Sequence, residues 1–466
     1  MLTLEALART VIGLDVEVPV HGGRRRYVNL DNAATTPALA PVRDAVDRFL
    51  PFYSSVHRGT GWKSRVSTEV YEESRRIVGD FVGADRTRDT VIFGKNTTEM
   101  VNKLARRVDL GSDRVVLISD MEHHSNDLPW RRVAQVERVP VDAKGAMDPD
   151  EIRKRLRRAH GRVKLIAVSG ASNVTGYLPD VHELAAIAHA YGARIVVDGA
   201  QLAPHRRIDM RPHDDEGHLD FVVLSAHKMY APYGTGALIG PRDLFAEGDP
   251  DHVGGGVVDV VTPHVAYWAA PPDKDEPGTP NLLGAVALAK VCRLLEEVGW
   301  DALVAHEREL TTYALTRLKK IDGVRLYGDD DETLSRDRVG VLPFNLKGVN
   351  HALAAAALGW EAGVGVRHGC FCAHPFIAHL LALDPEEQAR MMDRVLQEDR
   401  REIPGLVRMS FGIYNTRADV DVACDAIERL LRVGPKADYR LDPASGEYAP
   451  VAMPHDELEA ARRCWE

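Results

Sequence analysis

Two cysteines, Cys370 and Cys372, stand one residue apart in the stretch VRHGCFCAHPF, in a chain with only five cysteines. Four interpretations are open: a disulfide, a metal clip, a reactive nucleophile, or two small apolar residues. If the segment is extended, the two residues lie about 6.6–6.8 Å apart, at the upper limit for a disulfide. Tetrahedral metal ligands lie within about 4 Å of one another, which the alternating His368, Cys370, Cys372 and His374 meet only if Gly369 makes a turn. We therefore expect either a reactive thiol or small buried residues.

A carboxylate and an ammonium group follow two apolar, strand-like runs. Asp198 comes after the run in VVDGAQ, and Ser225, His227 and Lys228 come after the run in LSAHKMYAPYGTG. Ligands of open α/β sheets bind at the carboxyl ends of strands. Either charge alone is explained by an ion pair that ends a strand. Together they indicate a Schiff-base cofactor, in which the lysine binds the ring compound and the aspartate keeps its pyridinium nitrogen protonated.

A phosphate on such a cofactor needs hydrogen-bond donors. Thr97 and Thr98 begin a helical pattern directly after the strand-like TVIFGKN. The first N–H groups of a helix and two hydroxyl groups would then point at an anion. These two threonines are therefore candidate phosphate ligands.

Alternating strand and helix patterns must position these residues. Apolar, β-rich runs occur at 90–94, 114–118, 163–169, 194–199, 220–226 and 236–240. Helical patterns lie between them at 97–108, 148–159 and 180–192, and Asp148 is placed to cap the second of these. Continuous apolar strands are typical of a parallel sheet that is covered on both faces. The sequence thus predicts an α/β fold.

After about residue 280 the pattern changes to longer helices with fewer strands. Helical runs are expected at 281–298, 301–319, 384–402 and 417–432, with strands in VRLYG, RVGVLPFNL, GVGVRHG and VRMSFGIYN. This pattern predicts a second, smaller α+β domain. The glycine- and proline-rich stretch 251–280, which leads into PGTPN, is the expected connection.

Composition narrows the class of protein. The 466 residues are 45% hydrophobic and 27% charged, enough for one large domain and a smaller one. A net charge of −10 argues against binding to nucleic acid. Charged residues interrupt the N-terminal segment, and no apolar run approaches the roughly 18 residues of a membrane span. We therefore expect a soluble, cytoplasmic protein that does not bind membranes and lacks a disulfide framework.

Ten motifs together carry a resemblance to a known family. They are LDNAATTP, SVHRGTG, NTTEMVN, MEHHSNDLPW, SNVTG, DGAQ, SAHKMYAPYGTG, PGTPN, RHGCFCAHP and RMSFGIYNT. In order and detail they resemble class V aminotransferase-fold enzymes that use pyridoxal 5'-phosphate, and within these the group II cysteine desulfurases and selenocysteine lyases. The resemblance implies fold type I, with a large, mostly parallel-sheet domain at 28–280. Residues 1–27 and 281–434 would form the small domain, and 435–466 a C-terminal extension.

The resemblance assigns a set of cofactor contacts. Lys228 would bind pyridoxal phosphate as the Schiff base, Asp198 would pair with the ring nitrogen, and His123 would stack on the ring. The other implied contacts are Gln201 at the phenolic oxygen, Asn173 at the ring edge or the substrate, and Thr97, Thr98, Ser225 and His227 at the phosphate. Thr279 of PGTPN would reach the phosphate from a second subunit, which implies a homodimer.

The resemblance also assigns substrate contacts. Arg408 would grip the substrate carboxylate, a task that suits a planar guanidinium with two parallel donors. As a bare sequence feature it is more often a surface strand residue. The further candidate substrate-binding residues are Arg367, Asn32, Ala34 and His57.

One cysteine matches the family nucleophile and the other departs from the pattern. Cys372 aligns with the desulfurase nucleophile, and Arg367, His368 and His374 are expected to favour its thiolate, the attacking form. The desulfurases usually have histidine where this chain has Cys370. Gly-Cys-Phe-Cys resembles the molybdenum-cofactor sulfurases instead, although this chain has no room for their additional domain. Cys370 is therefore either a relay or resolving thiol, or a small buried residue.

The implied activity is desulfuration of L-cysteine to L-alanine, with a persulfide on Cys372 that passes to an acceptor, such as a sulfur-acceptor protein. Selenocysteine, cysteine sulfinate or a specialised amino acid are alternative substrates. A C–S lyase, an aminotransferase or an epimerase would share the cofactor residues but would not need Cys372. A non-catalytic scaffold is disfavoured because Lys228, Asp198 and His123 are all present. An inserted segment, 377–404, would cover the site mouth, dock a partner, or form a plain surface helix.

Overall fold

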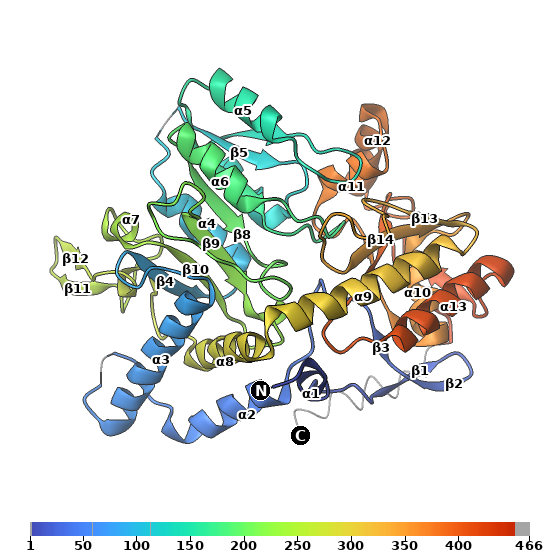
Figure 1. The fold of residues 1–466 in the computed structure, drawn as a ribbon, viewed down its shortest axis with the longest axis horizontal. Helices are drawn as coiled ribbons and strands as arrows, with labels where there is room; N and C mark the ends of the chain where they lie inside the picture. The colour runs from blue at the N-terminus through green and yellow to red at the C-terminus, as the bar shows by residue number, and fades with distance from the viewer. Residues whose placement is uncertain (1, 58, 112, 453–466) are drawn as a thin grey trace. The chain divides into compact units, whose positions relative to one another are not determined.

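The computed structural model describes residues 2–57, 59–111 and 113–452 (Figure 1). It consists of two compact units. The first comprises Met1–Ile12, Ala33–His306 and Asp337–Val339, and the second comprises Gly13–Asn32, Glu307–Arg336 and Gly340–Glu466. Arg58 of the motif SVHRGTG and residues 453–466 of the predicted C-terminal extension lie outside the described residues.

The first unit is built on a seven-stranded sheet with the strand order β4-β10-β9-β8-β7-β5-β6. The strands are β4 (Asp89–Gly94), β5 (Val115–Ser119), β6 (Gln135–Val139), β7 (Val163–Ser169), β8 (Arg194–Asp198), β9 (Phe221–Ser225) and β10 (Gly236–Pro241). β10 is antiparallel to both neighbours, and the other pairs are parallel. The predicted α/β fold with a mostly parallel sheet is confirmed. The sequence patterns miss β6, because glutamine, glutamate and arginine interrupt its apolar residues.

Helices pack against this sheet and bury its central strands. α4 (Thr97–Arg107) packs against β9 and β10, and α6 (Val181–Ala190) packs against β7 and β8. All five residues of β5 and of β9 are buried. Asp148 caps α5 (Pro149–Arg158), as predicted, by accepting a hydrogen bond from the N–H of Asp150. The central strands β5 and β9 are thus buried along their whole length, whereas the edge strand β6 is not.

The remaining elements of the first unit surround this sheet. They are α1 (Leu4–Ala8), α2 (Ala40–Phe49), η1 (Leu50–Phe52), α3 (Trp62–Phe81), η2 (His124–Asn126), η3 (Trp130–Arg132), η4 (Ala226–Lys228), α7 (Arg242–Ala246), β11 (Val258–Val261), β12 (Ala266–Trp268), η5 (Asp273–Asp275) and α8 (Leu282–Val298). The long helix α9 (Trp300–Lys319) begins in the first unit and continues in the second.

The second unit has its own sheet and its own core. A four-stranded sheet has the order β13-β14-β17-β16. Its strands are β13 (Val324–Leu326), β14 (Val341–Leu346), β16 (Arg367–Gly369) and β17 (Leu406–Ser410). Leu342 and Phe344 of β14 and Met409 of β17 are buried with residues of α9, α10 (His351–Ala362) and α13 (Arg417–Val433). This is an α+β arrangement in which β16 ends directly before the two cysteines.

Short elements complete the second unit. They are β1 (Glu17–Val20), β2 (Gly23–Arg26), β3 (Val28–Asn29), β15 (Val364–Gly365), α11 (His374–Leu380), α12 (Pro385–Leu396), β18 (Tyr439–Leu441) and β19 (Tyr448–Pro450). The predicted charged helix near 384–402 corresponds to α12, which contains no buried residue. Among the helices of the described residues, none is long and apolar enough to cross a membrane.

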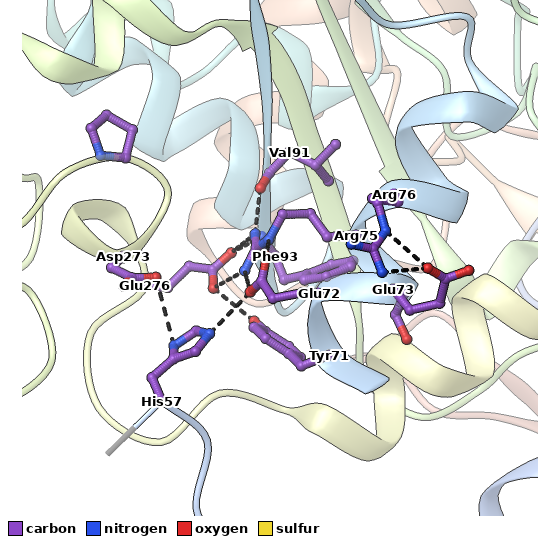
Figure 2. Close-up of polar contacts among 12 residues, drawn as sticks. His57, Tyr71, Glu72, Glu73, Arg75, Arg76, Val91, Phe93, Asp273 and Glu276 are labelled. Carbon is purple, nitrogen blue, oxygen red and sulfur yellow. Dashed lines mark hydrogen bonds and ion pairs between the residues drawn. The ribbon is translucent and has the colours of Figure 1, made fainter. Parts of the chain in front are cut away.

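A buried charge network fixes the segment that leads into PGTPN (Figure 2). The Arg75 guanidinium on α3 binds both carboxylate oxygens of Glu276, with Nη1–Oε1 and Nη2–Oε2 distances of 2.7 and 3.0 Å. Glu276 also accepts hydrogen bonds from the Tyr71 hydroxyl (2.7 Å) and the Phe93 N–H (2.6 Å). Bidentate pairing with further donors is what a buried carboxylate requires. The network therefore ties residues 277–281 to α3 and to the edge strand β4.

We predict that Arg75→Ala lowers the free energy of unfolding by about 3–5 kcal/mol, because Glu276 would become an uncompensated buried charge. The matched control is Arg76→Ala on the same helix, whose ion pair with Glu73 is exposed. Arg76→Ala should lower the free energy of unfolding by less than about 1 kcal/mol. Urea denaturation of the three proteins measures both changes. Equal losses for the two variants would show that the buried network contributes no more than a surface pair.

Candidate active site

The first unit gathers polar residues at the carboxyl ends of β8 and β9. Asp198 is the last residue of β8, and Lys228 ends the short helix η4 that follows β9. Parallel pairing places Asp198 beside Val223 of β9. Burial raises the pKa of Asp198, while the Ala200 N–H and the Lys228 charge oppose that rise. A buried carboxylate near one ammonium group is therefore positioned to hold a further cationic group.

Hydroxyl groups near the start of α4 form an anion cradle. Thr97 Oγ1 and Ser225 Oγ are buried and have no hydrogen-bond partner among the described residues. Gly236 pairs with both Ser225 and Gly94, so the end of β9 lies close to the start of α4. A side chain at Gly236 would meet the Asn96 backbone at 2.7 Å. Two unsatisfied hydroxyl groups thus lie where a phosphate would supply acceptors.

His227 is neutral in this setting. Burial, with the Lys228 charge, lowers the pKa of His227 to about 4. Its Nδ1 atom lies 3.2 Å from Thr35 Oγ1, and its carbonyl oxygen accepts from the hydroxyl groups of Thr35 and Thr36. A neutral imidazole held in this way contributes to an anion site as a hydrogen-bond donor rather than as a cation.

His123 is oriented by Ser125. The Ser125 N–H donates to His123 Nδ1 at 3.1 Å, and Ser125 Oγ lies 3.0 Å from the same nitrogen. Ser125 Oγ also lies 2.6 Å from Thr98 Oγ1. Because Nδ1 accepts a backbone hydrogen bond, a neutral His123 ring carries its proton on Nε2. The exposed Thr98 is thereby linked to His123 through one hydroxyl group.

The residues of the first unit fit pyridoxal phosphate. Gln201 Oε1 is a third buried polar atom with no partner among the described residues, and Gln201 Nε2 donates to the Ala33 carbonyl at 2.6 Å. Asn173 is buried in the segment after β7. Together with Thr97 and Ser225 these groups offer an aspartate, a lysine and unsatisfied polar atoms for a phosphorylated, cationic ring. That donor set matches the chemistry of the cofactor.

In the second unit, Asp31 pairs with both candidate substrate arginines. Arg408 Nη2 lies 2.9 Å from Asp31 Oδ1, and Arg367 Nε lies 3.1 Å from Asp31 Oδ2. Arg408 is buried, whereas Arg367 is exposed. Two guanidinium groups thus share one carboxylate. Such a cluster suits one additional carboxylate.

The two cysteines lie in a turn, so the extended geometry considered for them is wrong. Gly369, Phe371 and Cys372 have φ values of 99°, 50° and 55°. A strand requires negative φ values, and β16 ends at Gly369. Both thiols are free, and Cys372 is exposed. Cys370 is half-buried, donates to the Pro404 carbonyl, and has its pKa raised to about 11 by burial.

Two of the three expected neighbours of Cys372 have other partners. Arg367 pairs with Asp31, and His368 Nε2 lies 2.8 Å from Glu447 Oε2 in the C-terminal extension. Burial lowers the pKa of His374. Within the described residues, no group of three or more histidine, cysteine, aspartate or glutamate side chains is arranged to hold a metal ion.

Four further predicted residues have varied surroundings. Asn32 bonds to Ser410, Asn415 and Tyr414 within the second unit, which gives its side chain a structural role. In the first unit, His57 lies 3.0 Å from Glu72 and 3.6 Å from Asp273, and the bond to Glu72 raises its pKa. Figure 2 places His57 beside the Arg75 network. Ala34 is half-buried and Thr279 is exposed. Their roles at the substrate or the phosphate stay predictions.

Four residues of this arrangement escape the sequence analysis: Glu122, Ser125, Asp31 and Phe371. Each lies inside a motif that the resemblance uses, namely MEHHSNDLPW, LDNAATTP or RHGCFCAHP. Glu122 precedes the motif histidine His123, and Asp31 precedes Asn32. Acidic residues in these positions are sequence signals for supporting carboxylates. The contact between Phe371 and Arg408 has no such signal, because it joins residues far apart in the sequence.

Comparisons with known proteins place the chain in a family. The family "Aminotransferase class-V" matches residues 28–422. A "Probable cysteine desulfurase" of Halalkalibacterium halodurans is 33% identical over 86% of this chain and 92% of its own length. A "Probable cysteine desulfurase" of Halobacterium salinarum is 35% identical over 90% of this chain and 94% of its own.

Solved structures agree. The apo cysteine desulfurase of Thermococcus onnurineus NA1 has a TM-score of 0.75 and 31% identity, covering 87% of this chain and 95% of its own. The Escherichia coli cysteine desulfurase CsdA has a TM-score of 0.72 and 30% identity over the same shares. This chain therefore belongs to the class V aminotransferase family, and the resemblance seen in the sequence is confirmed.

A buried acid supports the segment that carries His123. Glu122 accepts hydrogen bonds from the Ser119 hydroxyl, the Asn126 amide (2.7 Å) and the Ser169 hydroxyl (2.7 Å). Burial nevertheless raises the pKa of Glu122 to about 7. The folded protein therefore holds a proton on this side chain over a pH range in which the unfolded chain has lost it.

We predict that this proton makes stability fall as pH rises. Between the ordinary glutamate pKa, about 4.3, and about 7 the folded state binds more protons, so the free energy of unfolding decreases with pH and then levels off. Glu122→Gln removes this contribution. The difference in unfolding free energy, wild type minus variant, should fall by on the order of 2 kcal/mol from about pH 5 to about pH 8. Parallel stability profiles for the two proteins would contradict a raised pKa at Glu122.

Proposed function

We propose that the chain is a pyridoxal-phosphate-dependent cysteine desulfurase, which converts L-cysteine to L-alanine and leaves the sulfur on Cys372. One observation carries the proposal: the chain has an exposed thiol, Cys372, and its buried Asp198 lies near enough to Lys228 to be affected by the charge of that lysine. The names of its 33–35% identical relatives support the same activity. A lyase, an aminotransferase or an epimerase of this fold would have no use for the thiol.

The first unit supplies the residues that would hold the cofactor. Lys228 would bind it covalently and Asp198 would pair with its ring nitrogen. The other proposed contacts are His123, Gln201 and Asn173 around the ring, Thr97, Thr98, Ser225 and His227 at the phosphate, and Thr279 from a second copy of the chain in a homodimer. When bound, the cofactor supplies an electron sink for the bonds to the substrate Cα atom.

Side chains of this protein would move the protons. The freed Lys228 amine would take the Cα proton of the substrate, as a general base. His123 would exchange the proton of the substrate thiol at Nε2, because its Nδ1 accepts from the Ser125 N–H. Ser125 and Glu122 support this geometry from the segment 122–126.

The second unit would supply carboxylate binding and the nucleophile. Arg408, with its neighbour Arg367, would bind the substrate carboxylate. The Cys372 thiolate would attack the substrate sulfur, so that the carbon–sulfur bond breaks, a sulfur–sulfur bond forms, and L-alanine is left. A thiol acceptor, free or on a partner protein, would then take the outer sulfur by exchange. The homodimer, the acceptor protein and the cytoplasmic location stay predictions.

We predict that purified, cofactor-loaded protein with L-cysteine and a thiol reductant yields alanine and sulfide in equal amounts. Cys372→Ser should lose this activity by at least about a hundredfold, because no thiolate remains to attack the sulfur. Cys292→Ala, which changes a buried cysteine in α8, is the control and should retain activity. Pyruvate and ammonia in place of alanine would assign a lyase, and unchanged alanine production by Cys372→Ser would refute the nucleophile.

A second prediction concerns the cofactor lysine. Borohydride reduction of the loaded protein should fix the cofactor to a peptide that contains Lys228, as read by peptide mass. Lys228→Ala should show no such adduct, whereas the exposed-lysine control Lys347→Ala should label like the wild type. An adduct on a different lysine would overturn the assignment while leaving the fold unaffected.

A further inference from the structure

The turn that carries Cys372 has an unusual backbone. Phe371 and Cys372 are consecutive non-glycine residues with positive φ, at 50° and 55°. For a bulky residue this left-handed conformation is a strained outlier. It persists only where surrounding contacts fix it. The Phe371 side chain is buried, so other groups surround its ring.

The Arg408 guanidinium contacts the Phe371 ring. The carbon at the centre of the guanidinium lies 4.8 Å from the centre of the Phe371 ring. The edge of the same guanidinium binds Asp31 at 2.9 Å. Arg408 is 3% exposed, and a cation over an aromatic face is stronger when water is excluded. The guanidinium is therefore held at its edge by a carboxylate and at its face by the residue next to Cys372.

The other end of the turn is also anchored. Cys370 Sγ donates to the Pro404 carbonyl at 3.4 Å, and the Ala373 N–H donates to the Cys370 carbonyl at 2.8 Å. Because burial raises the pKa of Cys370 to about 11, this thiol stays protonated near neutral pH. Cys370 therefore serves here as a fixed donor, and Phe371 is the point at which the turn meets Arg408.

Cys372 and Arg408 also interact through charge. Burial lowers the pKa of Arg408, whereas Asp31 and, more weakly, the Cys372 thiolate raise it. Cys372 therefore lies close enough to the guanidinium to act on it electrostatically. Phe371 is bonded covalently to Cys372, and its ring contacts the Arg408 guanidinium.

We propose that Phe371 is a positioning residue that fixes Cys372 relative to Arg408, so that the arginine of the carboxylate site also sets the place of the attacking thiol. This inference rests on the proposed function and goes beyond it by assigning a residue that touches no reacting atom. Phe371 acts through its ring face: leucine would fill similar space without offering a face to the cation, whereas tyrosine would retain it.

The first test is steady-state kinetics of alanine formation by the holoenzyme. Phe371→Leu should lower kcat about tenfold, because the thiol is less well placed for attack. The KM for L-cysteine should change less than about threefold, since Asp31 still holds Arg408. Phe371→Tyr should restore kcat to within about twofold. If Phe371→Leu does not fold, Phe371→Met replaces it. A wild-type kcat in the leucine or methionine variant overturns the proposal.

The second test needs no turnover. The rate at which iodoacetamide alkylates Cys372 is measured by mass in wild type, Phe371→Leu, Arg408→Lys and the double variant. The leucine change should alter the rate severalfold in the wild-type background and less than about 1.5-fold in the Arg408→Lys background, because coupled residues are not additive. Equal effects in both backgrounds overturn the proposal. If the wild type makes no alanine, the proposed function fails, and this cycle alone decides the inference.

Discussion

The parallel pairing of β7, β8 and β9 is the constraint on which the proposed cofactor site depends. It sets Ser169 beside Asp198 and Asp198 beside Val223, so these polar strand ends lie along one edge of the sheet. Ser169 in turn binds Glu122, which supports the segment carrying His123. A slip of one residue in this register would reverse the side chains of a strand and turn Asp198 away. The strand register therefore fixes the positions of Ser169 and Asp198.

In the second unit the main constraint is the burial of the Arg408 guanidinium. Removing Arg408 from water is costly unless its charge and its donors are satisfied. Asp31 meets part of that need, although it also pairs with Arg367. Phe371 covers the guanidinium face. Burial of Arg408 therefore links the proposed carboxylate site to the strained turn that presents Cys372.

Local patterns predict the first unit well. The apolar runs at 163–169 and 194–199 correspond to β7 and β8, and Asp198 and Lys228 stand out because charges rarely follow such strands without a reason. The turn at 370–372 is beyond such patterns, because alternation of residue types suggests a strand there, whereas contacts with residues distant in sequence, Arg408 and Pro404, help to hold the turn. Asp31 and Phe371 escape for the same reason: their partners are distant in sequence, and tertiary packing overrides the local signal.

The most direct test of a persulfide on Cys372 is to measure the mass of the intact holoenzyme after reaction with limiting L-cysteine in the absence of reductant. We predict that the wild type gains the mass of one sulfur atom, that peptide mapping places it on Cys372, and that Cys372→Ser gains none. A sulfur adduct that persists in Cys372→Ser, or its absence from a wild type that still forms alanine, would contradict a persulfide on Cys372 as the centre of the reaction.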